Sequence, residues 1–83
     1  MKITVRYFAS IREAIGQGSE AVETAATTLG ALRDELIARG GAHASSLARG
    51  RAVRVALNQT LSDEAAALAD GAEVAFFPPV TGG

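Results

Sequence analysis

The chain has 83 residues, of which 48% are hydrophobic and 20% charged, a composition typical of one globular domain rather than a disordered chain. Its eight basic and nine acidic residues nearly balance, with no basic block or arginine stripe, which argues against a nucleic-acid-binding protein. Cysteine is absent, which excludes disulfides and thiol chemistry, and the lack of a long apolar run or leader-like start leads us to expect a cytoplasmic protein without a membrane span.

Two strands and a short helix are predicted in the first part of the chain. Residues 2–8 alternate between polar and apolar, the pattern of a strand with one buried face. The S-x-x-E sequence that starts at Ser10 has the form of a capping box, and Gly16 predicts the end of a helix of about two turns. A turn follows at 16–19, and residues 21–24 predict a short edge strand.

The main helix is predicted from an N-cap, an apolar stripe and two terminal glycines. Thr28 is the predicted N-cap, and Gly40 with Gly41 ends the helix. The apolar stripe consists of Leu29, Leu32, Leu36 and Ile37. Arg33 and Asp34 are predicted to lie outside this stripe. Residues 42–51 predict a loop or a brief helix around Leu47.

The last third of the chain predicts two further strands. Residues 53–57 alternate again, and 58–60 have the composition of a turn. Ser62 is a possible start for a helical turn. Asp70-Gly71 is a strong turn signal directly before a strand at 73–77.

This order of elements predicts an α+β fold of the β-grasp type. The long helix can bury its leucine stripe only against one face of a mixed sheet, which then clasps it. In this arrangement the first and last strands lie side by side, and the chain leaves from a central strand. We therefore divide the sequence into a β-grasp domain, residues 1–77, and a projecting tail, residues 78–83.

The tail reads Pro-Pro-Val-Thr-Gly-Gly and suggests a segment that enters another protein. Tandem prolines favour an extended path of roughly 3.1 Å per residue, so the six residues could reach about 19 Å. Because glycine has no Cβ, Gly82 and Gly83 fit a channel too narrow for other residues. The glycines alone leave open the alternative of an ordinary flexible end.

Outside the tail, the sequence offers no pattern typical of an active site. His43 is the only histidine, and its small neighbours predict an exposed side chain without a catalytic role. Asp63 and Glu64 are adjacent and face apart, so they do not suggest a metal site. We therefore expect an incomplete enzyme whose chemistry belongs to the carboxylate of Gly83. That anion is a poor electrophile at pH 7, and a partner would have to activate it, for example as an acyl-adenylate made from ATP.

A second candidate feature is a set of apolar residues predicted on the outer face of the sheet. Phe8 shares its face of the first strand with polar residues, and one of Phe76 and Phe77 must face outward if the last strand is regular. Leu61 follows a turn and is also expected at the surface. Phe8 and Phe77 would form one apolar patch beside the tail, which is typical of a partner surface. Alternatively, the short helix or residues 58–72 could cover it.

Several stretches of the chain match one known family. Residues 58–61 (Asn-Gln-Thr-Leu) and 70–83 (Asp-Gly-Ala-Glu-Val-Ala-Phe-Phe-Pro-Pro-Val-Thr-Gly-Gly) are the most specific, and Tyr7-Phe8-Ala9 followed by Ile11-Arg12-Glu13 also fits. By these residues the chain resembles the small subunits of molybdopterin synthase over nearly its whole length. Residues 40–52 match no pattern of the family.

The resemblance implies a ubiquitin-like fold and a role as sulfur carrier. Gly83 would be adenylated by a partner of the ubiquitin-activating type with ATP and magnesium, and converted to a thiocarboxylate with sulfur from a persulfide on another protein. The tail, including Gly82, would then enter the large synthase subunit, where sulfur passes to a cyclic pyranopterin precursor to form the dithiolene of molybdopterin. The chain would be the non-catalytic sulfur donor of a heterotetrameric sulfurtransferase and would bind no cofactor itself.

By family position, the residues facing the partner are Phe8, Leu61, Phe77, Pro78, Pro79, Val80 and Thr81. The resemblance and the tail leave three alternatives. They are a sulfur carrier of another pathway, such as thiamine thiazole synthesis, a ubiquitin-like modifier joined to lysines through Gly83, and a plain interaction module.

Overall fold

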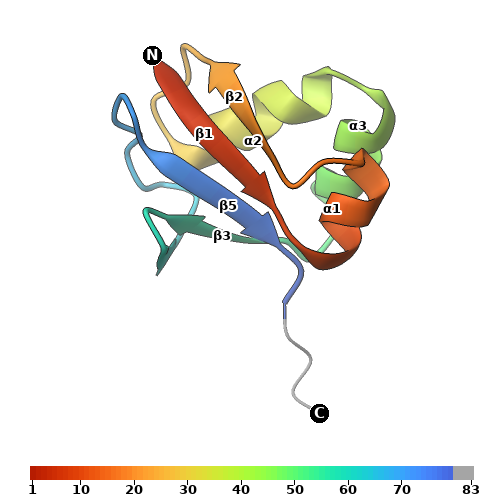
Figure 1. Cartoon of the computed structure of the whole chain (residues 1–83). Helices are drawn as coiled ribbons and strands as arrows, with labels where there is room; N and C mark the ends of the chain where they lie inside the picture. Colours follow the sequence, from red (N-terminus) through yellow and green to blue (C-terminus); the bar gives the residue numbers. More distant parts are fainter. Residues whose placement is uncertain (80–83) are drawn as a thin grey trace.

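The computed structural model describes residues 1–79, which form a five-stranded sheet and three helices (Figure 1). The strands lie in the order β2-β1-β5-β3-β4. Their bounds are β1 (Lys2–Tyr7), β2 (Ser19–Glu23), β3 (Arg54–Leu57), β4 (Thr60–Ser62) and β5 (Glu73–Phe77). The helices are α1 (Ala9–Ile15), α2 (Leu29–Ala38) and α3 (Gly41–Leu47).

The sheet is mixed, as predicted, and β5 lies in its centre. β1 and β5 are parallel neighbours, with Thr4 opposite Glu73 and Tyr7 opposite Phe76. The other neighbouring strands are antiparallel. The predicted contact between the first and last strands is therefore confirmed, and the chain beyond Phe77 leaves from the middle of the sheet.

The core lies between the sheet and α2. Alternation along β1 turns three apolar side chains inward, and the leucine stripe of α2 faces them, because each buried apolar surface needs the other to exclude water. The fully buried members of this core include Ile3, Val5, Tyr7, Leu29, Leu32, Leu36, Leu47, Val74 and Phe76. In Figure 1, α2 passes behind the sheet, and α1 and α3 lie beyond one end of it.

The start of α1 differs from the prediction. Its N-cap is Phe8, so Ser10 lies inside the helix and does not form a capping box. The reason is that β1 runs directly into the helix: the Phe8 N–H donates to the carbonyl of Phe76 at 3.2 Å, and Ala9 reverses the chain with a φ of 52°. The predicted end is confirmed, because Gly16 caps α1 in the left-handed conformation with a φ of 89°.

The predicted N-cap of α2 is confirmed, but one assignment on this helix is wrong. The Thr28 hydroxyl accepts a hydrogen bond from the Ala31 N–H at 3.2 Å. Arg33, expected outside the apolar stripe, is only 4% exposed, because backbone carbonyls from a distant loop surround its guanidinium. The segment after α2 forms α3, so the choice between a loop and a brief helix for 42–51 is decided in favour of the helix.

The segment after β3 contains a strand that the sequence did not predict. Asn58 and Gln59 both have positive φ values, 49° and 69°, and form a two-residue turn that returns the chain as β4. Ser62 therefore belongs to β4 and does not start a helical turn. The turn that follows is local, with the Asp63 carboxylate accepting from the Ala65 N–H at 2.8 Å.

Candidate functional site

A groove of about 800 Å³ lies on the outer face of the sheet, beside the point where the chain leaves β5. Its walls are largely apolar. They include Phe8, Leu61, Phe77, Pro78 and Pro79. These are five of the residues predicted to face a partner. Val80 and Thr81, predicted for the same surface, lie outside the described residues, as do Gly82 and Gly83.

The burial of the wall residues confirms the predicted exposed patch. Phe8 is 39% exposed and Leu61 62%, so neither α1 nor the segment after β3 covers them. Phe76 is 1% exposed and belongs to the core, whereas Phe77 is half-buried and lines the groove. The two adjacent phenylalanines thus serve opposite faces of β5. Contact with a partner stays a prediction for all of these residues.

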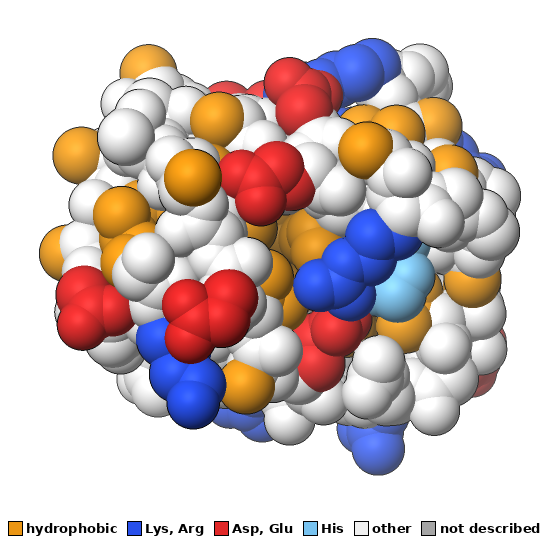
Figure 2. Space-filling model, turned by 90° about the horizontal axis from the view of Figure 1, so that it is seen from above, with side chains coloured by type: hydrophobic (Ala, Val, Ile, Leu, Met, Phe, Trp, Pro, Cys, Tyr) orange, Lys and Arg blue, Asp and Glu red, His pale blue; other side chains and the backbone are white. Residues whose placement is uncertain are grey.

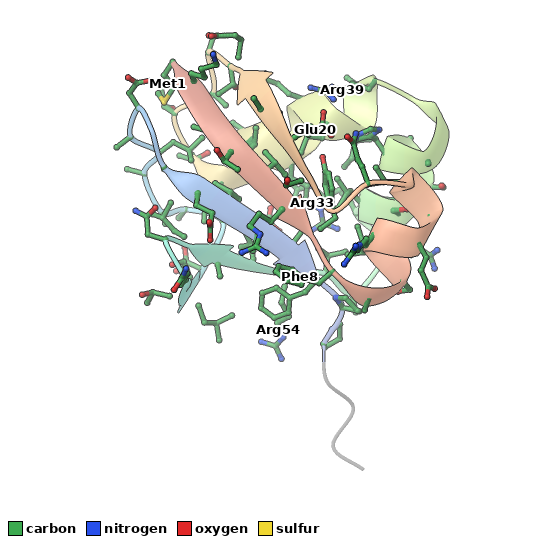
Figure 3. All side chains as sticks on the ribbon, in the orientation of Figure 1. Met1, Phe8, Glu20, Arg33, Arg39 and Arg54 are labelled. Carbon is green, nitrogen blue, oxygen red and sulfur yellow. The ribbon has the colours of Figure 1, made fainter. Side chains whose placement is uncertain are left out.

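Two charged side chains, from β1 and β5, also line the groove. The Arg6 guanidinium lies over the Phe8 ring, 5.1 Å from its centre, and 4.0 Å from the Glu73 carboxylate. Figure 3 shows Phe8 and Arg54 together where the sheet ends and the tail begins. Arg54 is paired with Phe77 in the register of β3 and β5. The surface around the exit of the tail is therefore apolar at its centre with arginines at its border.

Some groove residues were missed by the sequence reasoning. Ala56, Gln59 and Ala75 also line it. The signal was present for Ala75, because alternation places it on the same face as Phe77. Ala56 could be assigned only with the register of β3 against β5, which the sequence does not supply.

A second polar cluster lies on the other side of the molecule, around Glu20 of β2. Its carboxylate accepts a hydrogen bond from the Tyr7 hydroxyl at 2.7 Å and from the Arg39 guanidinium at 2.7 Å, and lies 2.9 Å from His43 Nε2. Figure 2 looks onto this side and shows the single histidine beside a basic and an acidic side chain, and Figure 3 shows Glu20 and Arg39 facing each other. The prediction of an exposed His43 is therefore wrong: its side chain is 17% exposed and packs edge-to-face on Tyr7.

The electrostatics of this cluster suit a structural contact. Partial burial raises the pKa of Glu20, but hydrogen bonds from His43, Tyr7 and Arg39 outweigh it and lower the pKa to about 2. Burial, then the hydrogen bond to Glu20, raises the pKa of Tyr7 above its usual range. Glu20 thus stays ionised and Tyr7 neutral near pH 7, and the cluster joins β1 and β2 to α3 and the end of α2.

A third cluster ties two loops to α2. Arg33 donates to the carbonyls of Leu47 and Ala48 at 2.7 and 2.8 Å and to the Glu64 carboxylate at 2.8 Å. Arg49 binds the other oxygen of Glu64 and also the Asp34 carboxylate. Hydrogen bonds from Arg49 outweigh partial burial and, together with those from Arg33, lower the pKa of Glu64. All of these groups are paired with one another, so the cluster supports the fold rather than offering a site.

Residues 1–79 contain neither a membrane-spanning helix nor a cluster of metal ligands. Over this range no helix has the length and apolar character needed to cross a bilayer. Within the same range no three His, Asp or Glu side chains are grouped as metal ligands. Within the described residues, the groove with Pro78 and Pro79 in its wall is therefore the candidate functional site.

Comparisons with known proteins agree with this architecture. The sulfur carrier subunit of molybdopterin synthase from Haemophilus influenzae is 42% identical over 81 residues, covering 98% of this chain and 99% of the relative. Among solved structures, SAMP1 of Haloferax volcanii has a TM-score of 0.79 at 27% identity, with full coverage of both chains. Also similar, over the full length of both chains, is a chain in the complex of subunits 1 and 2 of the molybdopterin-converting factor from Helicobacter pylori, with a TM-score of 0.70 at 28% identity.

The family assignment rests on the match to a family model as well as on these relatives. The model of the ThiS family matches residues 5–83, which include the groove residues and the tail. The ubiquitin-like β-grasp fold and the relatives matched over their full length agree with this match, and the chain therefore belongs to the ThiS family.

Proposed function

We propose that this chain is the sulfur-carrier subunit of a molybdopterin synthase. It would donate sulfur from a thiocarboxylate on Gly83 to a cyclic pyranopterin precursor, forming the dithiolene of molybdopterin. The observation that supports this most directly is the apolar groove at the base of the Pro78–Pro79 stem, in a chain 42% identical to a relative of that function. The groove provides a docking surface, and the tail provides the reacting group.

The chemistry needs activation of the terminal carboxylate by a partner. A carboxylate oxygen of Gly83 would attack the α-phosphorus of ATP, with loss of pyrophosphate, to give an acyl-adenylate. A persulfide sulfur would then displace AMP at the acyl carbon, and a thiol would cleave the sulfur–sulfur bond to leave the thiocarboxylate. ATP and magnesium would be bound by an adenylating enzyme of the ubiquitin-activating type, and the persulfide would belong to a further protein.

The contribution of this chain is to hold and aim the tail. β5 is bonded to β1 on one side and to β3 on the other, so the stem starts from a strand that is held on both sides. The groove beside it would fix the orientation of the partner, the large synthase subunit, and the tail would reach from there into the partner's active site. No side chain of this chain needs to act as acid, base or nucleophile in the transfer.

The test is a change of mass. Replacement of one carboxylate oxygen by sulfur adds about 16 Da, which intact-protein mass spectrometry resolves in a chain of this size. We expect this gain after incubation with the adenylating enzyme, ATP and a sulfur donor, and formation of molybdopterin when the large subunit and the pyranopterin precursor are added. An unchanged mass, under conditions that thiolate a known carrier, would contradict the proposal.

A ubiquitin-like modifier is the second candidate, favoured by the similarity to SAMP1, a small archaeal modifier protein. Both functions begin with the same activated Gly83, so adenylation does not separate them. They differ in the acceptor, which is a lysine for a modifier and a pterin precursor for a synthase subunit. Covalent conjugates in cells, together with no molybdopterin formation in the assay above, would favour the modifier.

A further inference from the structure

Two alanines form the floor of the groove. Ala56 of β3 and Ala75 of β5 are directly opposite each other in the sheet. In the same row, Arg6 of β1 lies opposite Ala75, and Leu61 of β4 lies opposite Ala56. One row across four strands therefore has large side chains at its two ends and two methyl groups at its centre.

The alanines make the groove deep. Alanine is depleted in β-strands, where β-branched and aromatic residues pack better on the pleated surface. At two paired positions of central strands, it leaves a hollow that Val or Ile would fill. Ala56 and Ala75 are 9% and 8% exposed although α2 packs on the opposite face. Their burial comes from the taller groove walls, including Phe8 and Phe77.

The tail and the groove have to be covered together. Pro78 and Pro79 line the groove, so a protein that encloses the tail also covers the groove. A partner surface that left the floor of the groove uncontacted would leave an empty apolar cavity there, which forfeits dispersion contacts. Arg6 of β1 and Glu73 of β5 also line the groove, but they pair with each other, and most of the other lining residues are apolar. The group that fits there is a large apolar side chain.

We propose that Ala56 and Ala75 form the floor of a socket for a bulky apolar side chain of the protein that receives the tail, and that their small size determines this fit. The inference deepens the proposed function and rests on it, because the large synthase subunit is the partner in question. Phe8 and Leu61 then act as walls of the socket, and the two alanines set its depth.

The test is to enlarge the two side chains that form the floor of the socket. Ala75→Leu and Ala56→Leu each add three carbons to the floor, and Ala75→Val adds two. Calorimetric titration with the large synthase subunit should give a dissociation constant at least about tenfold higher for each leucine variant, by analogy with the cost of overpacking, and an intermediate value for the valine variant.

A matched control separates this effect from damage to the sheet. Ala21 of β2 lies opposite Thr4 on the same outer face, is exposed, and is not part of the groove. Ala21→Leu should bind within about twofold of the unchanged chain, since surface substitutions usually have effects within 0.5 kcal/mol. The melting temperature of each variant shows whether it is folded. Ala56 and Ala75 are substituted in separate variants, so one misfolded variant leaves the other as a test.

The outcomes distinguish the socket from the proposed function. If the unchanged chain binds the large subunit and both folded leucine variants bind equally well, the socket is wrong and the proposed function stands. If the unchanged chain neither binds the large subunit nor gains sulfur, the proposed function fails first. Sedimentation of the chain alone gives a third result: a dimer abolished by Ala75→Leu would mean that a second copy fills the groove, and would overturn the inference.

Discussion

The two faces of the sheet use the same strands for different purposes. On the inner face, β1 contributes Ile3, Val5 and Tyr7, all at most 2% exposed, to a core closed by α2. On the outer face, the same segment contributes Arg6 and then Phe8, which is 39% exposed. One face is buried in the core, and the other keeps a groove of about 800 Å³.

The difference shows how so small a domain can separate stability from recognition. Alternation lets each strand place one side chain in the core and the next on the binding face. A substitution on the inner face should therefore affect mainly the free energy of unfolding. A substitution at the next position along the strand, on the outer face, should affect mainly the affinity for a partner.

Deletion of Gly83 should have the largest effect and only on function. The gain of about 16 Da should be lost completely, because the group to be thiolated is displaced by one residue. Among residues 1–79 the last member of the buried core is Phe76, so we expect no change in the melting temperature. A lower melting temperature of the deletion variant would show that the tail contributes to the fold, and the division into domain and tail would be wrong.

Leu32→Ala should have a large effect on stability alone. Leu32 is fully buried between α2 and the sheet, and its truncation should cost about 2–5 kcal/mol of unfolding free energy. Chemical denaturation measures this cost. At a temperature where the variant is folded, its affinity for the large subunit should equal that of the unchanged chain. A weakened complex would show that the two faces are coupled.

Glu20→Gln should lower stability by about 1–3 kcal/mol at pH 7, because charge-assisted hydrogen bonds from Arg39 and Tyr7 are lost. Glu20 has a folded-state pKa of about 2, below its ordinary value, so its contribution is complete above the unfolded pKa of about 4.5 and is lost as the pH falls toward 2. The difference between the two proteins should therefore shrink between about pH 4.5 and 2. Denaturation over this range checks the sign, and a constant difference would contradict it.

Phe8→Ala should have the smallest of these effects, and on affinity. It removes a groove wall that is 39% exposed, so we expect a loss of about 1–2 kcal/mol in binding to the large subunit, or about tenfold in affinity. The melting temperature should change little. Lys2→Ala, on the same strand face but outside the groove, is the matched control. Equal affinities of the two variants for the large subunit would show that Phe8 does not contribute to the interface.

The features that depend on local periodicity were predictable from the sequence. Alternation identified β1 and β3 and the outward position of Phe8. The Asp70-Gly71 turn signal located β5, and the apolar stripe with its Thr28 cap identified α2. The tail was recognised from its composition alone. In each case the decisive information lies within a few neighbouring residues, and the structure agrees for the strands and for α2.

The features that depend on distant partners were not predictable. Arg33 is polar by pattern, but it is buried because Leu47 and Ala48, 14 and 15 residues away, supply carbonyl acceptors. His43 contacts Glu20, 23 residues away. β4 has three residues, too few to show a period, and it exists because a two-residue turn pairs it with β3. Ala56 could be assigned to the groove only after the register of β3 against β5 was known.

The central position of β5 has a mechanical consequence. Four residue pairs join β5 to β1 and four join it to β3, and all of these contacts lie alongside the strand from which the tail departs. A force applied to the tail along the axis of β5 loads the hydrogen bonds to β1 and to β3 in shear. The two sets of bonds then resist the force together and do not break one after another. Forced unfolding depends on the rate at which such a barrier is crossed. In the proposed function, the pairing of β5 on both sides would let the tail be withdrawn from the partner without unravelling the domain behind it.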